Sequence, residues 1–192
     1  MPFLIMHPTV ESIAYYQYNN DIWLIFYRYS GIIEKIQDAI CRELNFMTNK
    51  YQRVKTILFN LHVNNYSDDN KVISLFMKSY IKKLERKYKS HIGYIWVREQ
   101  ANSINQHYHI AIFIDGKKCQ SSWIPFNMAK ETWEENQKSG TIKHIINGSY
   151  TINRSDRQSL QIVILRLSYY AKKRTKQKSS IKMKSFHTSH NK

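Results

Sequence analysis

The sequence predicts an α+β fold built as one domain around an antiparallel sheet. Apolar residues recur at steps of three and four in some segments, which indicates amphipathic helices, whereas other segments are short β-branched and aromatic runs typical of strands. The chain has 192 residues, 42% of them hydrophobic and 14% aromatic, with only five glycines and three prolines. This composition supplies a core and excludes fibrous and disordered proteins.

The first 30 residues are the least regular part of the sequence. They are rich in Tyr and Asn and contain one apolar run at 22–27, so we expect an N-terminal approach segment with at most one strand. After Ser30 the apolar positions 33, 36, 40, 44 and 47 recur at steps of three and four. This spacing predicts an amphipathic helix over 31–47.

The remaining elements follow in a regular order. Residues 54–63 are β-branched and aromatic over a strand's length, and the polar run 64–70 supplies a turn and a helix cap. The elements predicted after this turn are a basic helix over 71–89, strands at 92–99 and 107–114, a helix over 123–138, a strand at 141–152, and a last helix that begins after Ser155 and runs to about residue 173.

The order strand, helix, strand, strand, helix, strand is that of a ferredoxin-like, or RRM-like, sheet. Such a sheet carries its helices on one face. We therefore expect the other face to be open and to offer a platform for a strand of DNA or RNA.

Charge is the strongest compositional signal. Thirty Lys and Arg oppose 14 Asp and Glu, which gives a net charge of +16, and every acidic residue precedes position 172. Residues 174–192, a predicted basic C-terminal tail, hold six Lys and Arg and no acidic residue. A field of this sign attracts polyanions, and we expect nucleic acid rather than an acidic membrane surface as the partner.

Two observations indicate a cytoplasmic protein. The only cysteines, Cys41 and Cys119, match no metal-ligand spacing and are too few for a disulfide scaffold, so we expect reduced thiols. The N-terminus lacks the features of a signal peptide, and no apolar run approaches the ~18 residues of a membrane helix. We expect a soluble protein with no membrane partner.

A pair of histidines in the strand at 107–114 is a candidate metal site. Side chains alternate along a strand, so one set faces the helices and the other faces away from them. The first set is Tyr108, Ile110, Ile112 and Ile114, and the second is His107, His109, Ala111 and Phe113. Two imidazoles on one face can converge on one ion. Two exposed histidines also occur on strands that bind no metal, so the assignment of a metal site depends on the residues near them.

Glu99 ends the preceding strand and is the candidate third ligand. A carboxylate added to two imidazoles makes a site that suits Mg²⁺ or Mn²⁺, with phosphate as a further ligand. Strict alternation places Glu99 with Ile95 and Val97 on the predicted buried side, so this assignment needs a bulge or the strand end to turn the side chain round. The alternative is a strand-end charge paired with Arg98 or Lys118.

The last helix carries a candidate nucleophile beside a positive charge. Tyr169 and Lys172 are three positions apart and so share a helix surface, as do Tyr170 and Lys173. Tyrosine is a poor nucleophile at its ordinary pKa near ~10, but a metal-polarised phosphate and a nearby ammonium make attack feasible. Core packing is the alternative for two tyrosines on an apolar helix.

Candidate DNA contacts are polar side chains on the face of the histidine pair, aromatic side chains that can stack on bases, and cations where the tail begins. They are Asn60, His62, Tyr94, Trp96, Lys173 and Arg174.

Four segments in this order resemble the replication initiators of filamentous phages (inoviruses) and related mobile elements, within the endonuclease superfamily named for a histidine-hydrophobe-histidine (HUH) motif. The segments are ILFNLHV at 57–63, YIWVREQ at 94–100, QHYHIAIF at 106–113 and RLSYYAK at 166–172. The resemblance spans about Ser30 to Gln177. It implies a nuclease domain over 31–173.

The resemblance also implies residue roles. His107 and His109 would be metal ligands, Glu99 the third ligand, Tyr169 the nucleophile and Lys172 its helper. The family pattern of Ser, Tyr, any residue, small residue and Lys selects Tyr169, and Tyr170 is the second candidate.

The implied function is a metal-dependent, single-stranded DNA endonuclease and ligase that initiates rolling-circle replication by transesterification. Mg²⁺ or Mn²⁺ would be the cofactor, and a single-stranded replication origin and host replication proteins the partners. One alternative is a single-tyrosine transposase of the same superfamily. The other is a module without catalysis, in which Tyr94, Trp96 and Phe113 stack on bases and the basic tail grips phosphates.

Overall fold

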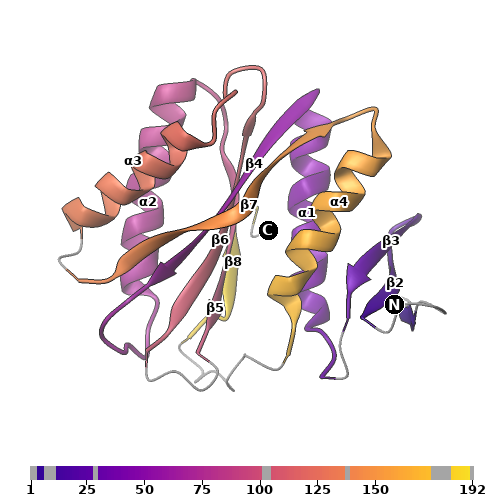
Figure 1. The fold of residues 1–192 in the computed structure, drawn as a ribbon, viewed down its shortest axis with the longest axis horizontal. Coiled ribbons are helices and arrows are strands. Elements are labelled where there is room, and N and C mark those ends of the chain that lie inside the picture. Colours follow the sequence, from indigo (N-terminus) through magenta and orange to yellow (C-terminus); the bar gives the residue numbers. More distant parts are fainter. Residues whose placement is uncertain are drawn as a thin grey trace.

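The computed structural model describes residues 4–6, 12–27, 30–100, 105–136, 139–173 and 183–190. These residues form two antiparallel sheets and four α-helices (Figure 1). The predicted α+β class is therefore confirmed.

The larger sheet has five strands in the order β7-β4-β6-β5-β8, and each strand is antiparallel to its neighbours. Its strands are β4 (Arg53–His62), β5 (Gly93–Glu99), β6 (His107–Asp115), β7 (Thr141–Asn153) and β8 (Phe186–Thr188). Strands β4 and β6 are central, and they pair along their whole lengths.

The helices are α1 (Glu34–Lys50), α2 (Lys71–Tyr88), α3 (Trp123–Asn136) and α4 (Arg157–Ser168). From residue 53 to α4 the order of strands and helices is the predicted one. The end of the last helix is not, because Tyr169–Ala171 form a 3₁₀ turn and Lys172 is extended, with φ −56° and ψ 134°. The prediction that the helix continues through residue 173 is therefore wrong.

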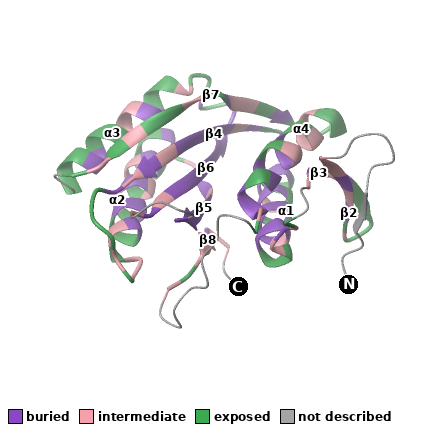
Figure 2. Cartoon of the chain, turned by 60° about the horizontal axis from the view of Figure 1, so that its bottom comes forward, coloured by how far each residue is buried: buried purple, intermediate pink, exposed green. Residues whose placement is uncertain are grey.

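Helices cover both faces of the larger sheet (Figure 1). Helices α2 and α3 pack on the face that carries Ile57, Phe59, Tyr108, Ile110 and Ile112. On the other face, α1 and α4 pack over Leu58, Ile95, Val97, Ala111 and Phe113. The predicted open face is thus wrong. Both sets of alternating side chains are apolar, so both faces must be covered, and Figure 2 shows the central strands as buried.

Three strands form where the sequence indicated an irregular N-terminal segment. They are β1 (Leu4–Met6), β2 (Ile13–Tyr18) and β3 (Asp21–Phe26), in the order β1-β2-β3. This small sheet docks on α4, because the Gln161 amide donates to the Leu24 carbonyl at 2.8 Å and accepts from the Leu24 N–H at 2.9 Å. The expectation of at most one strand is therefore wrong.

Part of the predicted basic tail returns to the larger sheet. Strand β8 pairs with Ile95–Val97 of β5, and the adjacent Ser189 hydroxyl donates to the Glu43 carboxylate of α1. His190 Nδ1 lies 3.4 Å from the other Glu43 oxygen.

Among the described helices, none combines the length and apolar character that crossing a lipid bilayer requires.

Candidate metal and nucleophile site

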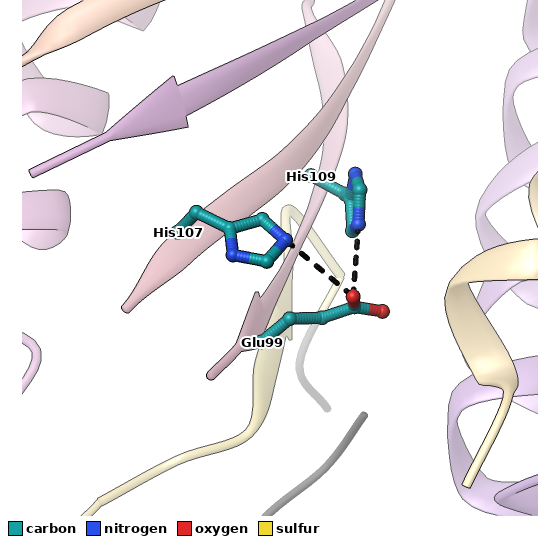
Figure 3. A group of neighbouring side chains, drawn as sticks. All are labelled: Glu99, His107 and His109. Atoms are coloured by element: carbon teal, nitrogen blue, oxygen red, sulfur yellow. Dashed lines mark ion pairs between the residues drawn. The ribbon is translucent and has the colours of Figure 1, made fainter. Parts of the chain in front are cut away.

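Glu99, His107 and His109 meet where β5 ends and β6 begins (Figure 3). Glu99 Oε2 lies 3.5 Å from His107 Nε2 and 3.2 Å from His109 Nε2. One ligand atom from each residue lies within 4.8 Å of the others. Two imidazole nitrogens and a carboxylate oxygen at this spacing can bind one divalent ion after small side-chain adjustments.

Glu99 reaches the histidines by ordinary strand alternation. The register pairs Glu99 with His107 and Val97 with His109, without interruption along β5 and β6. Because Ile95 and Val97 pack under α1 and α4, their face is the face of the histidines and not that of α2 and α3. The expectation that a bulge or the strand end turns Glu99 round is therefore wrong, because regular alternation brings the three side chains together.

A hydrogen bond orients the more buried histidine. Asn60 lies opposite His109 in the register of β4 and β6, and its Oδ1 lies 2.7 Å from His109 Nδ1. When the Asn60 oxygen accepts the Nδ1 proton, the ring is held as the tautomer whose Nε2 lone pair points at Glu99. Metal-ligating histidines usually donate the proton of their other ring nitrogen to a carbonyl or carboxylate group in this way.

His62 extends the imidazole cluster onto β4. Its ring stacks on His107 with centroids 5.3 Å apart and an interplanar angle of 13°. Burial lowers the pKa of His62, and the nearby His107, Lys143 and His109 lower it further. The site thus favours the neutral form of the His62 ring that stacks on His107.

Lys172 connects this cluster to Tyr169. Its Nζ lies 3.7 Å from Glu99 Oε2 and 3.6 Å from the centre of the Tyr169 ring. Tyr169 is 37% exposed, and its ring centroid lies 6.1 Å from that of His109. The Lys172 ammonium thus lies between the Glu99 carboxylate and the Tyr169 ring and contacts the ring as a cation–π pair.

The main chain explains why Lys172 lies here. After α4 the chain pairs with the segment before α1, where the Ile33 N–H donates to the Ala171 carbonyl at 2.7 Å and the Lys173 N–H donates to Gly31 at 3.0 Å. Gly31 has φ +75°, a left-handed conformation that favours glycine. This pairing ends the helix and aims the Lys172 side chain at the carboxylate.

Tyr170 has the opposite surroundings. It is 3% exposed, stacks on His109 with centroids 5.0 Å apart, and donates its hydroxyl to the Ile110 carbonyl at 3.4 Å. Burial raises the pKa of this hydroxyl above its ordinary value. The structure thus packs Tyr170 and leaves Tyr169 accessible, and the identity of the reacting residue stays a prediction.

The aromatic DNA-contact candidates lie away from this site. Tyr94 and Trp96 are on the face of α2, and the ring of His187 from β8 stacks on both. Trp96 is buried on that face, and Phe113 is buried under α1 and α4. Neither Trp96 nor Phe113 offers a surface on which a base can stack, so the arrangement does not favour a module that binds bases through them.

The polar candidates divide differently. Asn60 and His62 lie beside the histidine pair, as alternation predicted, but Asn60 contacts His109. Lys173 is exposed, and its side chain lies where a Cβ added to Gly31 would be in van der Waals contact with it. Arg174 lies outside the described residues.

Sequence reasoning missed two contributions to the site. The first is the role of Asn60 in orienting His109, for which the signal is its place opposite His109 in two strands of matched length. The second is Phe26 of β3, whose ring centroid lies 5.9 Å from that of Tyr169. Nothing in the irregular N-terminal pattern pointed to Phe26.

The chain belongs to the YagK/YfjJ C-terminal domain family, whose profile matches residues 17–189. Searches among curated proteins and among solved structures found no match. The matched span begins within β2 and ends after β8, so the family's domain includes β3, the cluster of Glu99, His107 and His109, and the returning C-terminal strand.

Proposed function

We propose that this member of the YagK/YfjJ C-terminal domain family is a metal-dependent endonuclease and ligase of single-stranded DNA that initiates rolling-circle replication by tyrosine transesterification. The observation that carries the proposal is the convergence of a His-His-Glu cluster with a lysine and an accessible tyrosine. Groups able to hold a phosphate, attack it and stabilise charge thus lie within one site. The net charge of +16 favours a polyanionic substrate.

The proposal includes a ferredoxin-like, RRM-like arrangement of the larger sheet. It is supported by the element order β4-α2-β5-β6-α3-β7 and by the antiparallel strand order β7-β4-β6-β5. In this interpretation α1 and α4 are additions that cover the second face. DNA then binds at the end of the sheet that carries the cluster, rather than across an open face.

Glu99, His107 and His109 would hold the divalent ion, Mg²⁺ or Mn²⁺. The fit is supported by the short distances among their ligand atoms and by the hydrogen bond from His109 to Asn60. Bound there, the ion would hold the scissile phosphodiester and polarise its non-bridging oxygens. The remaining steps belong to side chains of the chain itself.

Tyr169 is the proposed nucleophile. Its phenolic oxygen forms a bond to phosphorus, and the bond between phosphorus and O3′ breaks. The 5′ end stays on the protein as a phosphotyrosine, and the released O3′ gains a proton to replace the one that the tyrosine hydroxyl loses. Since one ester replaces another, the 3′ hydroxyl can reverse the reaction and reseal the strand without a nucleotide cofactor.

Lys172 is placed to assist this exchange. Its ammonium lies over the Tyr169 ring and near the Glu99 carboxylate, so it would stabilise the negative charge that develops on the phosphate during the exchange. Tyr170 has no such role in the proposal, because its hydroxyl points to a buried carbonyl. Host replication proteins would use the released 3′ hydroxyl.

The test is formation of a covalent protein-DNA adduct on single-stranded DNA with Mn²⁺, followed by peptide mapping. Tyr169→Phe keeps the ring and should abolish the adduct, whereas the neighbouring Tyr170→Phe should still form it. Chelation of the metal should stop both cleavage and adduct formation.

Two outcomes would overturn the proposal. DNA cleavage without an adduct on either tyrosine would indicate hydrolysis by a water molecule, and binding without cleavage would indicate a module without catalysis. A single-tyrosine transposase would form the same adduct, but on the ends of a mobile element instead of a replication origin.

A further inference from the structure

A cavity of about 460 Å³ lies next to Tyr169, within the size range of small-molecule sites in proteins. It is lined by Phe26, Tyr150, Ile162, Leu165, Arg166 and Tyr169. These residues come from β3, β7, α4 and the turn that follows α4. The small N-terminal sheet and the candidate nucleophile therefore both form walls of this cavity.

The wall from the small sheet is firmly attached to α4. The Phe26 N–H donates to the Ser168 hydroxyl at 2.7 Å, and that hydroxyl donates to the Leu165 carbonyl at 2.7 Å. At the other end of the helix, the Arg157 guanidinium lies 4.2 Å from the centre of the Trp23 ring. The Phe26 ring is thus held at a tilt of 54° to Tyr169 before any ligand binds.

The lining has the chemistry that binds a flat, polar aromatic group attached to an anion. It combines aromatic rings, two aliphatic side chains and the exposed guanidinium of Arg166, and none of its lining residues is acidic. Bases of single-stranded nucleic acid stack on such rings, and a guanidinium can stack on a base or pair with a phosphate.

We infer that this cavity binds one nucleobase of single-stranded DNA, on a nucleotide directly next to the phosphate that Tyr169 attacks. The inference rests on the proposed function only for that position along the strand. Because Tyr169 is both a wall of the cavity and the proposed nucleophile, a base bound in the cavity brings the backbone of its nucleotide close to Tyr169. The small sheet thereby takes part in substrate recognition.

Photocrosslinking tests the base site without requiring cleavage. The probes are random-sequence single-stranded oligonucleotides, one pool with 5-bromouracil replacing thymine and another with 8-azidoadenine replacing adenine. After irradiation of the full chain, we expect crosslinked peptides that contain Phe26, Tyr150 or Tyr169. Phe26→Leu should reduce this crosslinking about 5- to 100-fold, the loss expected for one stacked base.

Trp123→Leu is the matched control for Phe26→Leu, because Trp123 is an exposed aromatic residue on α3 outside the cavity lining. Arg166→Gln tests the cation of the cavity, with exposed Arg86 of α2 changed to Gln as its control. The two control variants should crosslink as the unaltered chain does. Equal crosslinking in all four variants, or crosslinks that all map away from the cavity, would overturn the inference.

Cleavage of the random pool adds a readout of position. Sequencing of cut products from the unaltered chain should show a base preference at a nucleotide adjoining the cut, and Phe26→Leu and Arg166→Gln should weaken that preference more than preferences elsewhere. Crosslinks in the cavity without any cleavage would refute the nuclease but keep the base site. Cleavage with an adduct on Tyr169 but no cavity crosslinks would support the nuclease and refute the base site.

Discussion

Removal of the Asn60 side-chain amide should weaken metal binding although Asn60 itself is not a proposed ligand. The Asn60 oxygen lies 2.7 Å from His109 Nδ1, and His109 is only 8% exposed, so water cannot easily replace this partner. Asn60→Leu keeps the approximate volume and removes the acceptor. The His109 ring then loses the contact that selects its tautomer and its orientation toward Glu99.

The magnitude follows from the hydrogen bond. Its net value is about 1 to 1.5 kcal/mol, and a tenfold change in affinity corresponds to about 1.4 kcal/mol, so the bond alone accounts for about a tenfold loss. Residues that support metal-ligating histidines in this way typically change metal affinity about 10- to 100-fold. We therefore expect Mn²⁺ to bind Asn60→Leu about 10- to 100-fold more weakly.

The assay is Mn²⁺ titration of the DNA-free protein, followed by the electron paramagnetic resonance signal of free Mn²⁺. Asn60→Asp should retain binding, because a carboxylate also accepts the Nδ1 proton, and exposed Asn49 of α1 changed to Leu is a control for the loss of an amide. If Asn60→Leu bound Mn²⁺ as tightly as the unaltered chain while His109→Ala did not, the orienting role of Asn60 would be refuted.

Three further predictions concern other parts of the chain. Tyr170→Phe should lower the free energy of unfolding by about 1 kcal/mol in urea, for loss of one hydrogen bond; unchanged stability would mean that this bond contributes nothing. Replacing the Lys and Arg residues of 174–182 by Gln should flatten the slope of log affinity for single-stranded DNA against log salt by about 0.7 per lost phosphate contact, and an unchanged slope would exclude the segment as a DNA contact. Burial raises the pKa of Glu43 in the folded protein above its value in the unfolded chain. The free energy of unfolding therefore falls as the pH rises from the unfolded pKa through the folded pKa, because the buried carboxyl becomes charged. Glu43→Gln should therefore raise Tm more at about pH 8 than at about pH 4, and an equal Tm difference at both pH values would contradict this reasoning.

Truncation of the predicted basic tail after Lys173 would not isolate the effect of its charges. The structure places Phe186–Thr188 in the larger sheet and Ser189 on Glu43, so truncation would also remove an edge strand and a partly buried hydrogen bond. Composition cannot reveal a strand of three residues.

Much of the fold follows from periodicity. Each element from β4 to α4 is local, and the apolar spacing of each was enough to predict its type and, except for the end of α4, nearly its bounds. Alternation also assigned Leu58, His109 and Ala111 to one face. It could not show what covers that face, because the packing of α1 and α4 over Leu58 and Ala111 is a long-range contact that no local pattern records.

The small sheet was missed for a different reason. Strand β2 alternates between buried and partly exposed positions, with Ala14 and Tyr16 fully buried. Tyr15 and Tyr18 at the less buried positions are also amphipathic, so apolar and polar positions look alike in the sequence. Without that contrast the alternation of a strand is hidden.

The part of the candidate site that depends on strand register was predictable, and the part that depends on where helix α4 ends was not. His107, His109 and Glu99 follow from two adjacent strands, once the face of Ile95 and Val97 is known. The contact of Lys172 with Tyr169 was predicted from helical spacing, yet it forms beyond the helix end and depends on pairing of the chain with Gly31. Lys172 and Tyr169 are thus in contact as predicted, but because of this main-chain pairing rather than because of helical spacing.

Coverage of both sheet faces changes where the proposed substrate can lie. A DNA strand cannot cross the middle of the sheet, because Ala111 and Phe113 are buried under helices. Among the described residues around the cluster, exposed groups include the His107 edge, with 22% of its side chain accessible, and Tyr169 and Lys173 on the turn after α4. In the proposed function, a strand at the cluster would run along the start of β6 and the turn after α4, where Tyr169 also lines the cavity. The proposed nucleophile would then lie between the candidate metal ligands and the proposed base site.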